Sequence, residues 1–258
     1  MSTNGLLEGK SVIVSGAGRG LGKAYAEALR DKGVKVLGFD LLESVHEIDG
    51  IESVVADISK REDVERVVAA AEEAFGGVDI LVNNAGAWRV TLVDSPWEQA
   101  VEDWDFIMDT NLRGLLMLSR VCVPIMQRNG GGDIVNISTY YVLPARSDGT
   151  NNPQTDLYCA SKWALNGFTD AWSKSLAKDN IRVNAMCMGA TDTPMLRGLF
   201  PDKQLPPEMA AEVMSAEDIA QQMIDLINDG RTGENIGAWV GYPIELGPRK
   251  YAHKRITG

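Results

Sequence analysis

Residues 11–40 constrain the fold of this chain more than any other stretch of its sequence. Residues 11–15 are a short β-branched run, and residues 16–22 follow at once as a turn containing four glycines, Gly-Ala-Gly-Arg-Gly-Leu-Gly. Residues 23–32 are rich in helix-favouring side chains, and residues 34–39 form a second apolar run. This order predicts a strand, a tight turn, a helix and a second strand, which together make a parallel βαβ unit.

The glycine spacing indicates what the turn can bind. Gly16, Gly20 and Gly22 form a Gly-x-x-x-Gly-x-Gly pattern, because Leu21 stands where the last glycine of Gly-x-Gly-x-x-Gly would be. Glycines let the backbone approach a phosphate closely, and the following helix offers free N–H groups and the positive end of its dipole. We therefore expect this turn to hold the pyrophosphate of a dinucleotide.

Two charged residues bear on which dinucleotide is bound. Asp40 ends the second predicted strand, where a carboxylate can accept hydrogen bonds from the adenosine ribose and would repel a 2′-phosphate. Arg19 is a cation in the glycine turn and by its charge would favour NADP, but position 41 is Leu rather than a second basic residue. The pattern favours NAD over NADP.

Length and composition predict one undivided domain over residues 1–258. The chain is 45% hydrophobic and 24% charged, as in ordinary globular proteins. Its formal charge of −11 argues against nucleic-acid and membrane partners. Residues 1–10 lack the pattern of a signal peptide, so we expect a cytoplasmic protein. With three cysteines and two histidines we expect no metal centre.

Strand-like and helical runs alternate along the rest of the chain, which predicts a doubly wound parallel sheet with helices on both faces. The segment 191–214 contains four prolines, so it cannot be one helix, and a connection of this length is typical of a substrate lid. Further strands are expected at residues 51–56, 78–82, 133–137, 181–186 and 236–240, and further helices at 61–75, 104–128, 158–178 and 215–228.

Tyr158 and Lys162 are the residues with the clearest chemistry. They stand four positions apart, so on a helix they share one face. Tyrosine is a poor base near neutral pH, but an adjacent ammonium group typically lowers the pKa of an acid by about 1–3 units. We expect the pair to act as a general base or acid for an alcohol or carbonyl.

Three motifs in this order resemble the short-chain dehydrogenase/reductase family over about residues 8–195. They are the glycine turn 16–22, Asn83-Asn-Ala-Gly86 after the fourth strand, and Tyr158-x-x-x-Lys162. The resemblance implies a Rossmann fold and an oxidoreductase that uses NAD, or NADP by a weaker argument, on a small-molecule secondary alcohol or ketone. It also implies a homo-oligomer, either a tetramer or a dimer.

The resemblance assigns roles to individual residues. Tyr158 would be the acid/base, Lys162 would also hold the nicotinamide ribose, and Asn111 would support a water relay from a kinked helix. A hydroxyl after strand five would orient the substrate oxygen; the alignment selects Thr139, with Ser138 as the alternative. The expected cofactor contacts are Gly16, Arg19, Gly20, Leu21, Asp40, Asp57, Ile58, Asn84, Ala85, Gly86, Tyr158, Lys162, Gly189, Thr191 and Thr193.

The chain departs from the family pattern in three places. The stretch between Thr139 and Tyr158 is longer than usual, which predicts an extra loop at the rim of the pocket. Met188-Gly189 replaces the usual Pro-Gly after strand six, and the usual Asp-Gly-Gly after the last strand is absent. Because of the last change, the family pattern does not predict the C-terminal edge of the sheet or its subunit contacts.

Side chains expected near the strand ends predict an apolar, partly aromatic pocket for a lipophilic or ring-bearing substrate. An NADP-dependent carbonyl reductase and a non-catalytic dinucleotide sensor are the alternatives that the sequence leaves open. The expected pocket residues are Trp88, Tyr140, Tyr141, Met188, Met195, Leu196, Leu199 and Phe200.

Overall fold

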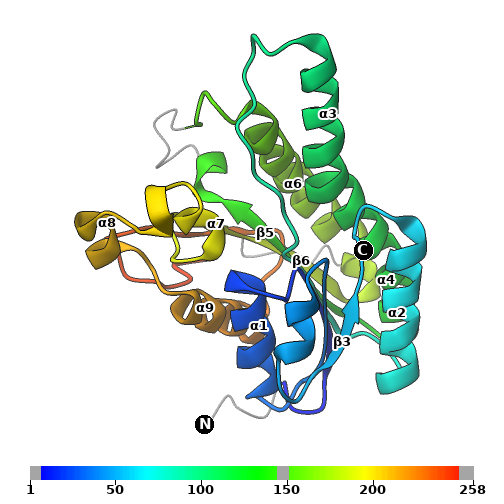
Figure 1. Ribbon diagram of the computed structural model, residues 1–258. Helices are drawn as coiled ribbons and strands as arrows, with labels where there is room; N and C mark the ends of the chain where they lie inside the picture. The colour runs from blue at the N-terminus through cyan, green and yellow to red at the C-terminus, as the bar shows by residue number, and fades with distance from the viewer. Residues whose placement is uncertain (1–6, 144–150, 250–258) are drawn as a thin grey trace.

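A single seven-stranded parallel sheet forms the centre of the molecule (Figure 1). The structure is a computed structural model that describes residues 7–143 and 151–249. The strand order β3-β2-β1-β4-β5-β6-β7 confirms the predicted doubly wound arrangement. The strands are β1 (Ser11–Ser15), β2 (Lys35–Asp40), β3 (Glu52–Val55), β4 (Ile80–Asn83), β5 (Gly132–Thr139), β6 (Ile181–Met188) and β7 (Asn235–Ala238).

Helices cover both faces of the sheet (Figure 1). The long helices are α1 (Gly20–Arg30), α2 (Arg61–Phe75), α3 (Trp97–Met108), α4 (Leu115–Arg128), α6 (Asp156–Ser175) and α9 (Ala216–Asp229). Val12 and Val14 of β1 pack in the core with α1 and α9, whereas Ile13 packs with α2 and α4 on the other face. This division follows from the alternation of side chains along a strand.

The strand order places a ligand crevice between β1 and β4. The chain runs outward from β1 to β3 and then returns to the other side of β1, so the connections after β1 and β4 leave the sheet in opposite directions. Ligands of open parallel sheets bind at such switch points, beyond the carboxyl ends of the strands. The glycine turn follows β1 and the Asn-Asn-Ala-Gly turn follows β4, so both lie at this crevice.

The helix predicted at residues 104–128 differs from the observed one. The observed helix begins earlier, at Trp97 directly after Pro96. It includes a π-helical turn, η3 (Asp109–Gly114), between α3 and α4. The N–H groups at the start of a helix have no acceptor within the helix, so proline, which has no N–H, loses no hydrogen bond at this boundary. The π turn contains Asn111, where the sequence predicted a kink.

The other boundaries shift by a few residues. α1 begins at Gly20 rather than Lys23, so Gly20 and Gly22 of the glycine turn belong to its first turn. The segment 191–214 is broken into short helices, α7 (Pro194–Arg197), η6 (Pro201–Lys203) and α8 (Pro207–Glu212). Its two ends are joined by a bridge between Thr191 and Met214. Residues 144–150, part of the predicted extra loop, lie outside the described residues.

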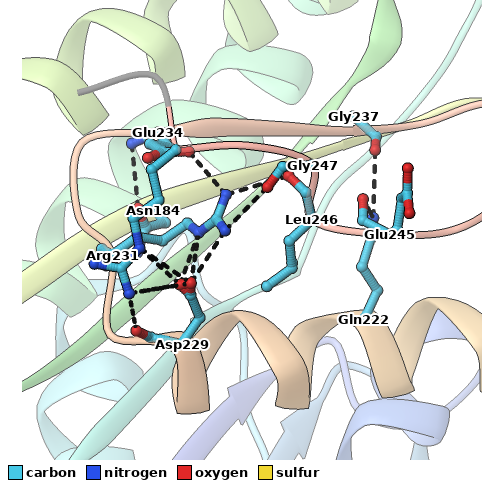
Figure 2. A network of polar contacts seen from close by, with 10 residues as sticks. Asn184, Gln222, Asp229, Arg231, Glu234, Gly237, Glu245, Leu246 and Gly247 are labelled. Atoms are coloured by element: carbon cyan, nitrogen blue, oxygen red, sulfur yellow. Dashed lines mark hydrogen bonds and ion pairs between the residues drawn. The ribbon is translucent and has the colours of Figure 1, made fainter. Parts of the chain in front are cut away.

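A buried arginine holds the segment after β7 (Figure 2). Arg231 lies between Asp229 and Glu234, with ion pairs of 3.0 Å to each, and donates to the carbonyl oxygens of Leu246 and Gly247 at 3.2 Å. A buried arginine is stable only when its donors are satisfied. The C-terminal segment thus returns along the sheet edge. None of the described helices is long and apolar enough to span a bilayer.

Candidate active site

The glycine turn has a geometry that only glycine allows. Gly16 and Gly20 have φ angles of +67° and +55°, in the left-handed region that L-residues rarely adopt. A Cβ on Gly22 would lie 1.9 Å from the carbonyl oxygen of Gly16. No side chain caps the N-terminus of α1, so the backbone N–H groups of its first turn are available to a phosphate. The turn therefore fits a dinucleotide pyrophosphate.

Asp40 lies at the end of β2 with its carboxylate against the glycine turn. Its Oδ2 accepts a hydrogen bond of 2.9 Å from the backbone N–H of Gly18, and its Oδ1 accepts one of 3.0 Å from Leu42. Arg19 is exposed and does not cap α1 with its side chain. Leu21, two residues after Arg19 and within the first turn of α1, is half-buried and packs against the core.

The turn after β4 is tied to the glycine turn by Ser15 and Asn84. Ser15 Oγ accepts hydrogen bonds from the N–H groups of Asn84 and Ala85 at 2.9 and 3.0 Å. The amide of Asn84 donates to the carbonyl oxygens of Ser15 and Gly16 at 2.9 and 3.1 Å. Both Nδ2 hydrogens of Asn84 are thereby used within the protein. The side chain holds the two turns in register.

Asp57 and Ile58 follow β3 at the same edge of the sheet. Asp57 Oδ1 accepts hydrogen bonds from the N–H and hydroxyl of Ser59, at 2.9 and 2.7 Å. Ile58 is buried, and its carbonyl oxygen would lie 2.7 Å from a Cβ on Gly114. This turn therefore packs directly against the π-helical segment η3.

Asn111 is fixed from two sides within the π turn. Its Oδ1 accepts a hydrogen bond of 2.7 Å from the N–H of Ala87, and its Nδ2 donates to the Ala87 carbonyl at 3.0 Å. Nδ2 also donates to Ser161 Oγ at 3.1 Å. A Cβ on Gly86 would lie 3.7 Å from both Asn111 Oδ1 and Lys162 Nζ. Asn111, Gly86 and Lys162 thus meet at one place; π turns are frequent at functional sites.

Tyr158 and Lys162 share one face of α6, as predicted from their spacing. Lys162 Nζ lies 5.7 Å from the centroid of the Tyr158 ring and donates a hydrogen bond of 2.7 Å to the carbonyl oxygen of Ile137. Burial lowers the pKa of Lys162 to about 8. The protein provides no carboxylate partner for this amine in the described hydrogen bonds and ion pairs.

The pKa of Tyr158 differs from the expectation. Burial is the main cause that raises the pKa of Tyr158 above its ordinary value, and Tyr141 and Cys159 add to the increase. The sequence argument predicted a lowered pKa from the Lys162 ammonium, and this prediction is wrong for the protein alone. Desolvation disfavours both the phenolate and the ammonium, so burial raises the pKa of the Tyr158 phenol and lowers the pKa of the Lys162 amine.

Thr139 rather than Ser138 lies with its hydroxyl toward the Tyr158 phenol. A hydrogen bond from Thr139 to Tyr158 opposes the effect of burial on the pKa of Tyr158. Ser138 Oγ instead lies 3.5 Å from the backbone carbonyl oxygen of Lys162, a long contact for a hydroxyl donor. Thr139 ends β5 and is buried.

The segment after β6 reaches back to the glycine turn. Gly189 donates its N–H to Ala238 at 2.8 Å, and Thr191 Oγ1 donates to the Gly189 carbonyl at 3.2 Å. Thr193 accepts a hydrogen bond from Leu196 and caps α7. Its Cβ would lie 3.5 Å from a Cβ on Gly20. The start of segment 191–214 is therefore in contact with the turn expected to hold the pyrophosphate.

The expected pocket residues differ in their accessibility. Met188 is buried in the main core with Met214 and Ile236. Met195 and Leu199 of segment 191–214 are exposed. The remaining five are half-buried: Trp88, Tyr140, Tyr141, Leu196 and Phe200.

Comparison with known proteins identifies the family. The sequence profile of the family described as short chain dehydrogenase matches residues 10–204. The chain belongs to the short-chain dehydrogenase family. As a member of this family it is an oxidoreductase that uses a nicotinamide cofactor.

Two curated relatives of this short-chain dehydrogenase are 3-oxoacyl-[acyl-carrier-protein] reductases. The enzyme of Thermotoga maritima is 33% identical over 253 residues, which cover 90% of this chain and 96% of the relative. That of Vibrio cholerae is 34% identical over 199 residues, covering 75% and 78%.

Two solved structures have folds similar to that of this chain. The 3-ketoacyl-(acyl-carrier-protein) reductase of Brucella melitensis, complexed with NADH, has a TM-score of 0.77 at 29% identity and covers 91% of this chain and 98% of its own. A 7α-hydroxysteroid dehydrogenase, complexed with NADH and 7-oxo glycochenodeoxycholic acid, has a TM-score of 0.82 at 25% identity, with coverages of 95% and 99%.

Two serines of the site were not singled out by sequence reasoning. Ser15 joins the turns after β1 and β4, and Ser161 links the amide of Asn111 to the carbonyl of Tyr158, to which its Oγ donates at 2.7 Å. The only signal in the sequence was position: Ser15 is the last residue of a strand, and Ser161 lies three residues after Tyr158.

Proposed function

We propose that this short-chain dehydrogenase transfers a hydride between NAD and a lipophilic or ring-bearing secondary alcohol or ketone, with Tyr158 as the acid/base. The observation that carries the proposal is the convergence of Thr139, Tyr158, Lys162 and Asn111 beside the turn after β4, which contains Gly86. A bound nicotinamide cofactor supplies or accepts the hydride. The protein's own residues bind and orient the substrate and move the proton.

The proton step is assigned to the hydroxyl of Tyr158. In the reduction direction its proton passes to the oxygen of the substrate carbonyl, as the carbonyl carbon gains the hydride. Thr139, hydrogen-bonded to the same phenol, would orient that oxygen. Because burial raises the pKa of Tyr158, the phenol carries its proton at neutral pH. This favours ketone reduction as the reaction to test first.

The remaining roles follow from position. Lys162 would hold the nicotinamide ribose, and its ammonium would stabilise the phenolate once the proton has left Tyr158. Asn111 would order a water next to Lys162, since its side chain is already fixed by Ala87 and Ser161. The backbone of Gly16, Gly20 and Leu21 would bind the pyrophosphate.

The other expected cofactor contacts stay predictions. Asp57 and Ile58 would hold the adenine, and Ala85 and Gly86 the adenosine ribose, with Asn84 acting through the loop that it ties down. Arg19 would approach the phosphates from the exposed side of the turn. Gly189, Thr191 and Thr193 would contact the nicotinamide amide.

NAD is proposed as the cofactor because of the carboxylate of Asp40. It lies against Gly18 at the edge of the turn, where a 2′-phosphate would meet an uncompensated negative charge. A strong native preference for NADP would support the alternative, an NADP-dependent carbonyl reductase.

A second candidate reaction is the reduction of a 3-oxoacyl thioester. It is favoured by the similarity to the Thermotoga maritima 3-oxoacyl-[acyl-carrier-protein] reductase over 90% of this chain. The acid/base chemistry would be the same, so only substrate comparison separates the two. Parallel assays with cyclic or aryl ketones and with an acetoacetyl thioester would rank them by kcat/KM.

Substitution of Tyr158 by Phe tests the proposal directly. It removes the acid/base hydroxyl but keeps the ring, so turnover should fall by at least about a hundredfold while cofactor affinity changes little. The assay is the absorbance of the reduced cofactor, with cofactor binding measured separately by fluorescence. Unchanged turnover in Tyr158→Phe would remove Tyr158 from the mechanism, and absence of any turnover in the wild type would favour a dinucleotide sensor.

Segment 191–214 is proposed as the substrate lid. It begins against Gly20 and exposes Met195 and Leu199, which an apolar substrate could cover. A homo-oligomer is also proposed, because α3 exposes the large apolar side chains of Trp97, Val101 and Trp104. The predicted cytoplasmic location stays a prediction.

A further inference from the structure

The first turn of α6 carries Tyr158 at an end of the helix that has no side-chain cap. α6 begins at Asp156, so Tyr158 lies two residues after its start. The N–H groups of a first helical turn have no acceptor within the helix, and helix ends fray. Thr155, at the N-cap, makes no side-chain hydrogen bond to these groups. The position of the Tyr158 phenol therefore depends on contacts between this turn and the rest of the protein.

Thr91 makes such contacts from the segment that follows β4. Its hydroxyl Oγ1 donates a hydrogen bond of 2.5 Å to Oδ1 of Asp156, and its backbone N–H donates to the carbonyl oxygen of Gln154 at 2.8 Å. Thr91 also forms a β-bridge with Thr155. The backbone nitrogen of Leu157 donates to Asp156 Oδ1 at 2.7 Å and lies 3.5 Å from Thr91 Oγ1. Thr91 thus contacts each of the four residues directly before the proposed acid/base.

The segment that carries Thr91 is itself fixed by two other elements. Ala87, at its start, donates its N–H to Asn111 Oδ1 at 2.7 Å and accepts a hydrogen bond from Asn111 Nδ2 at 3.0 Å. Arg89 donates from Nη1 to the buried carboxylate of Asp103 in α3 at 2.8 Å. Alternate residues of the segment thus bind η3, α3 and α6. Thr91 is therefore fixed relative to the part of the site that contains Asn111.

The hydrogen bonds of the Thr91 hydroxyl are with the end of α6, and none of residues 154–157 is an expected cofactor contact. A misplacement of about 1 Å in a reacting group can cost about a hundredfold in rate. Resting on the acid/base role proposed above for Tyr158, we propose that Thr91 is a positioning residue of the reaction. Its hydroxyl holds the first turn of α6, so that the Tyr158 phenol stays at the Thr139 hydroxyl, where the substrate oxygen would bind.

Substitution of Thr91 by Val tests the inference, because it removes the hydroxyl and keeps the β-branched shape. The backbone N–H can still bond to Gln154, and water can solvate the exposed Asp156 carboxylate, so the fold should persist. The chemical step is measured in a single turnover with the best ketone or thioester substrate of the wild type, since kcat can report product release instead. We expect its rate to fall at least about tenfold, while KM and the affinity for the reduced cofactor stay within about twofold. Thr91→Ser keeps the hydroxyl and should recover the rate to within about threefold of the wild type.

Thr169→Val is the matched control on the same helix. Thr169 is buried, and its hydroxyl accepts a hydrogen bond of 3.0 Å from Asn136 Nδ2. It lies about three helical turns after Tyr158, so its loss should lower the thermal stability but leave the single-turnover rate within about twofold of the wild type. Amide hydrogen exchange of residues 156–159 is a readout independent of turnover. It should become faster in Thr91→Val and stay unchanged in Thr169→Val.

Three results would overturn the inference. They are equal rate losses in Thr91→Val and Thr169→Val, a change in KM or cofactor affinity alone, and a Thr91→Ser variant as slow as Thr91→Val. The Tyr158→Phe variant separates this inference from the proposed function. If Tyr158→Phe loses turnover but Thr91→Val keeps the wild-type rate, the inference alone fails. If Tyr158→Phe keeps full turnover, or the wild type turns over none of the ketones and thioesters with either cofactor, the proposed function fails and the inference fails with it.

Discussion

Lys162 Nζ donates a hydrogen bond of 2.7 Å to the carbonyl oxygen of Ile137, and this contact joins α6 to β5 at the candidate site. Ile137 precedes Ser138 and Thr139, whereas Lys162 lies one helical turn after Tyr158. The contact therefore holds together the two elements that bring the Thr139 hydroxyl to the Tyr158 phenol. It also keeps the lysine amine buried without a carboxylate among the partners described for it.

Replacing Lys162 by Met should stabilise the fold near neutral pH while removing activity. Burial lowers the folded-state pKa to about 8, whereas an unfolded lysine titrates near ~10.4. The unfolded state thus binds more protons between these values, and the wild type gains stability as pH rises through this window. The advantage of Lys162→Met, up to about 3 kcal/mol below pH ~8, should shrink toward pH ~10. Urea unfolding of both proteins at pH ~7 and ~9.5 measures it; an advantage that grows with pH would contradict the assignment.

Replacing Ser161 by Ala should reduce activity more than stability. The change removes the hydroxyl between Asn111 and the carbonyl of Tyr158, so Asn111 keeps only its bonds to Ala87. We expect about a tenfold loss of kcat/KM and about 1 kcal/mol of stability. Ser175→Ala, at an exposed hydroxyl on the same helix, is the control and should change neither. Equal activity of the two variants would show that Ser161 does not position the site.

Replacing Gly22 by Ala should abolish cofactor binding. The new Cβ would lie 1.9 Å from the Gly16 carbonyl oxygen, so the turn or the start of α1 must move. Gly167→Ala makes the same change inside α6, where a Cβ has no atom within 4 Å. That variant should gain up to about 1 kcal/mol of stability and keep full affinity. Calorimetric titration with the cofactor distinguishes them, and tight binding by Gly22→Ala would show that the turn is not the pyrophosphate site.

Replacing Asp40 by Asn should weaken the discrimination between the two dinucleotides. Asparagine keeps the shape and an oxygen that can accept from Gly18, but it removes the negative charge. The ratio of NADP to NAD affinity should rise by about tenfold, which corresponds to about 1.4 kcal/mol. Fluorescence titration with both reduced cofactors gives the ratio. An unchanged ratio would mean that Asp40 does not read the 2′ position.

Local sequence patterns determined the elements of the fold and the turns that carry the site. Residues 11–40 predicted the first βαβ unit, because β-branched runs, glycines and helix formers act on the backbone over a few residues. The alternation of strands and helices predicted a parallel sheet, and parallel strands put the turns after β1 and β4 at one edge. The spacing of Tyr158 and Lys162 on one helical face followed in the same way.

Tertiary structure alone decided how these groups behave. The pKa of Tyr158 is raised rather than lowered, because desolvation depends on segments distant in sequence that pack over the phenol. The amide of Asn84 binds Ser15 and Gly16, and the π turn aims Asn111 at Ser161, through contacts that no local pattern encodes. A sequence specifies which side chains are present and their local backbone. Burial and hydrogen-bond partners depend on the packing of the whole chain.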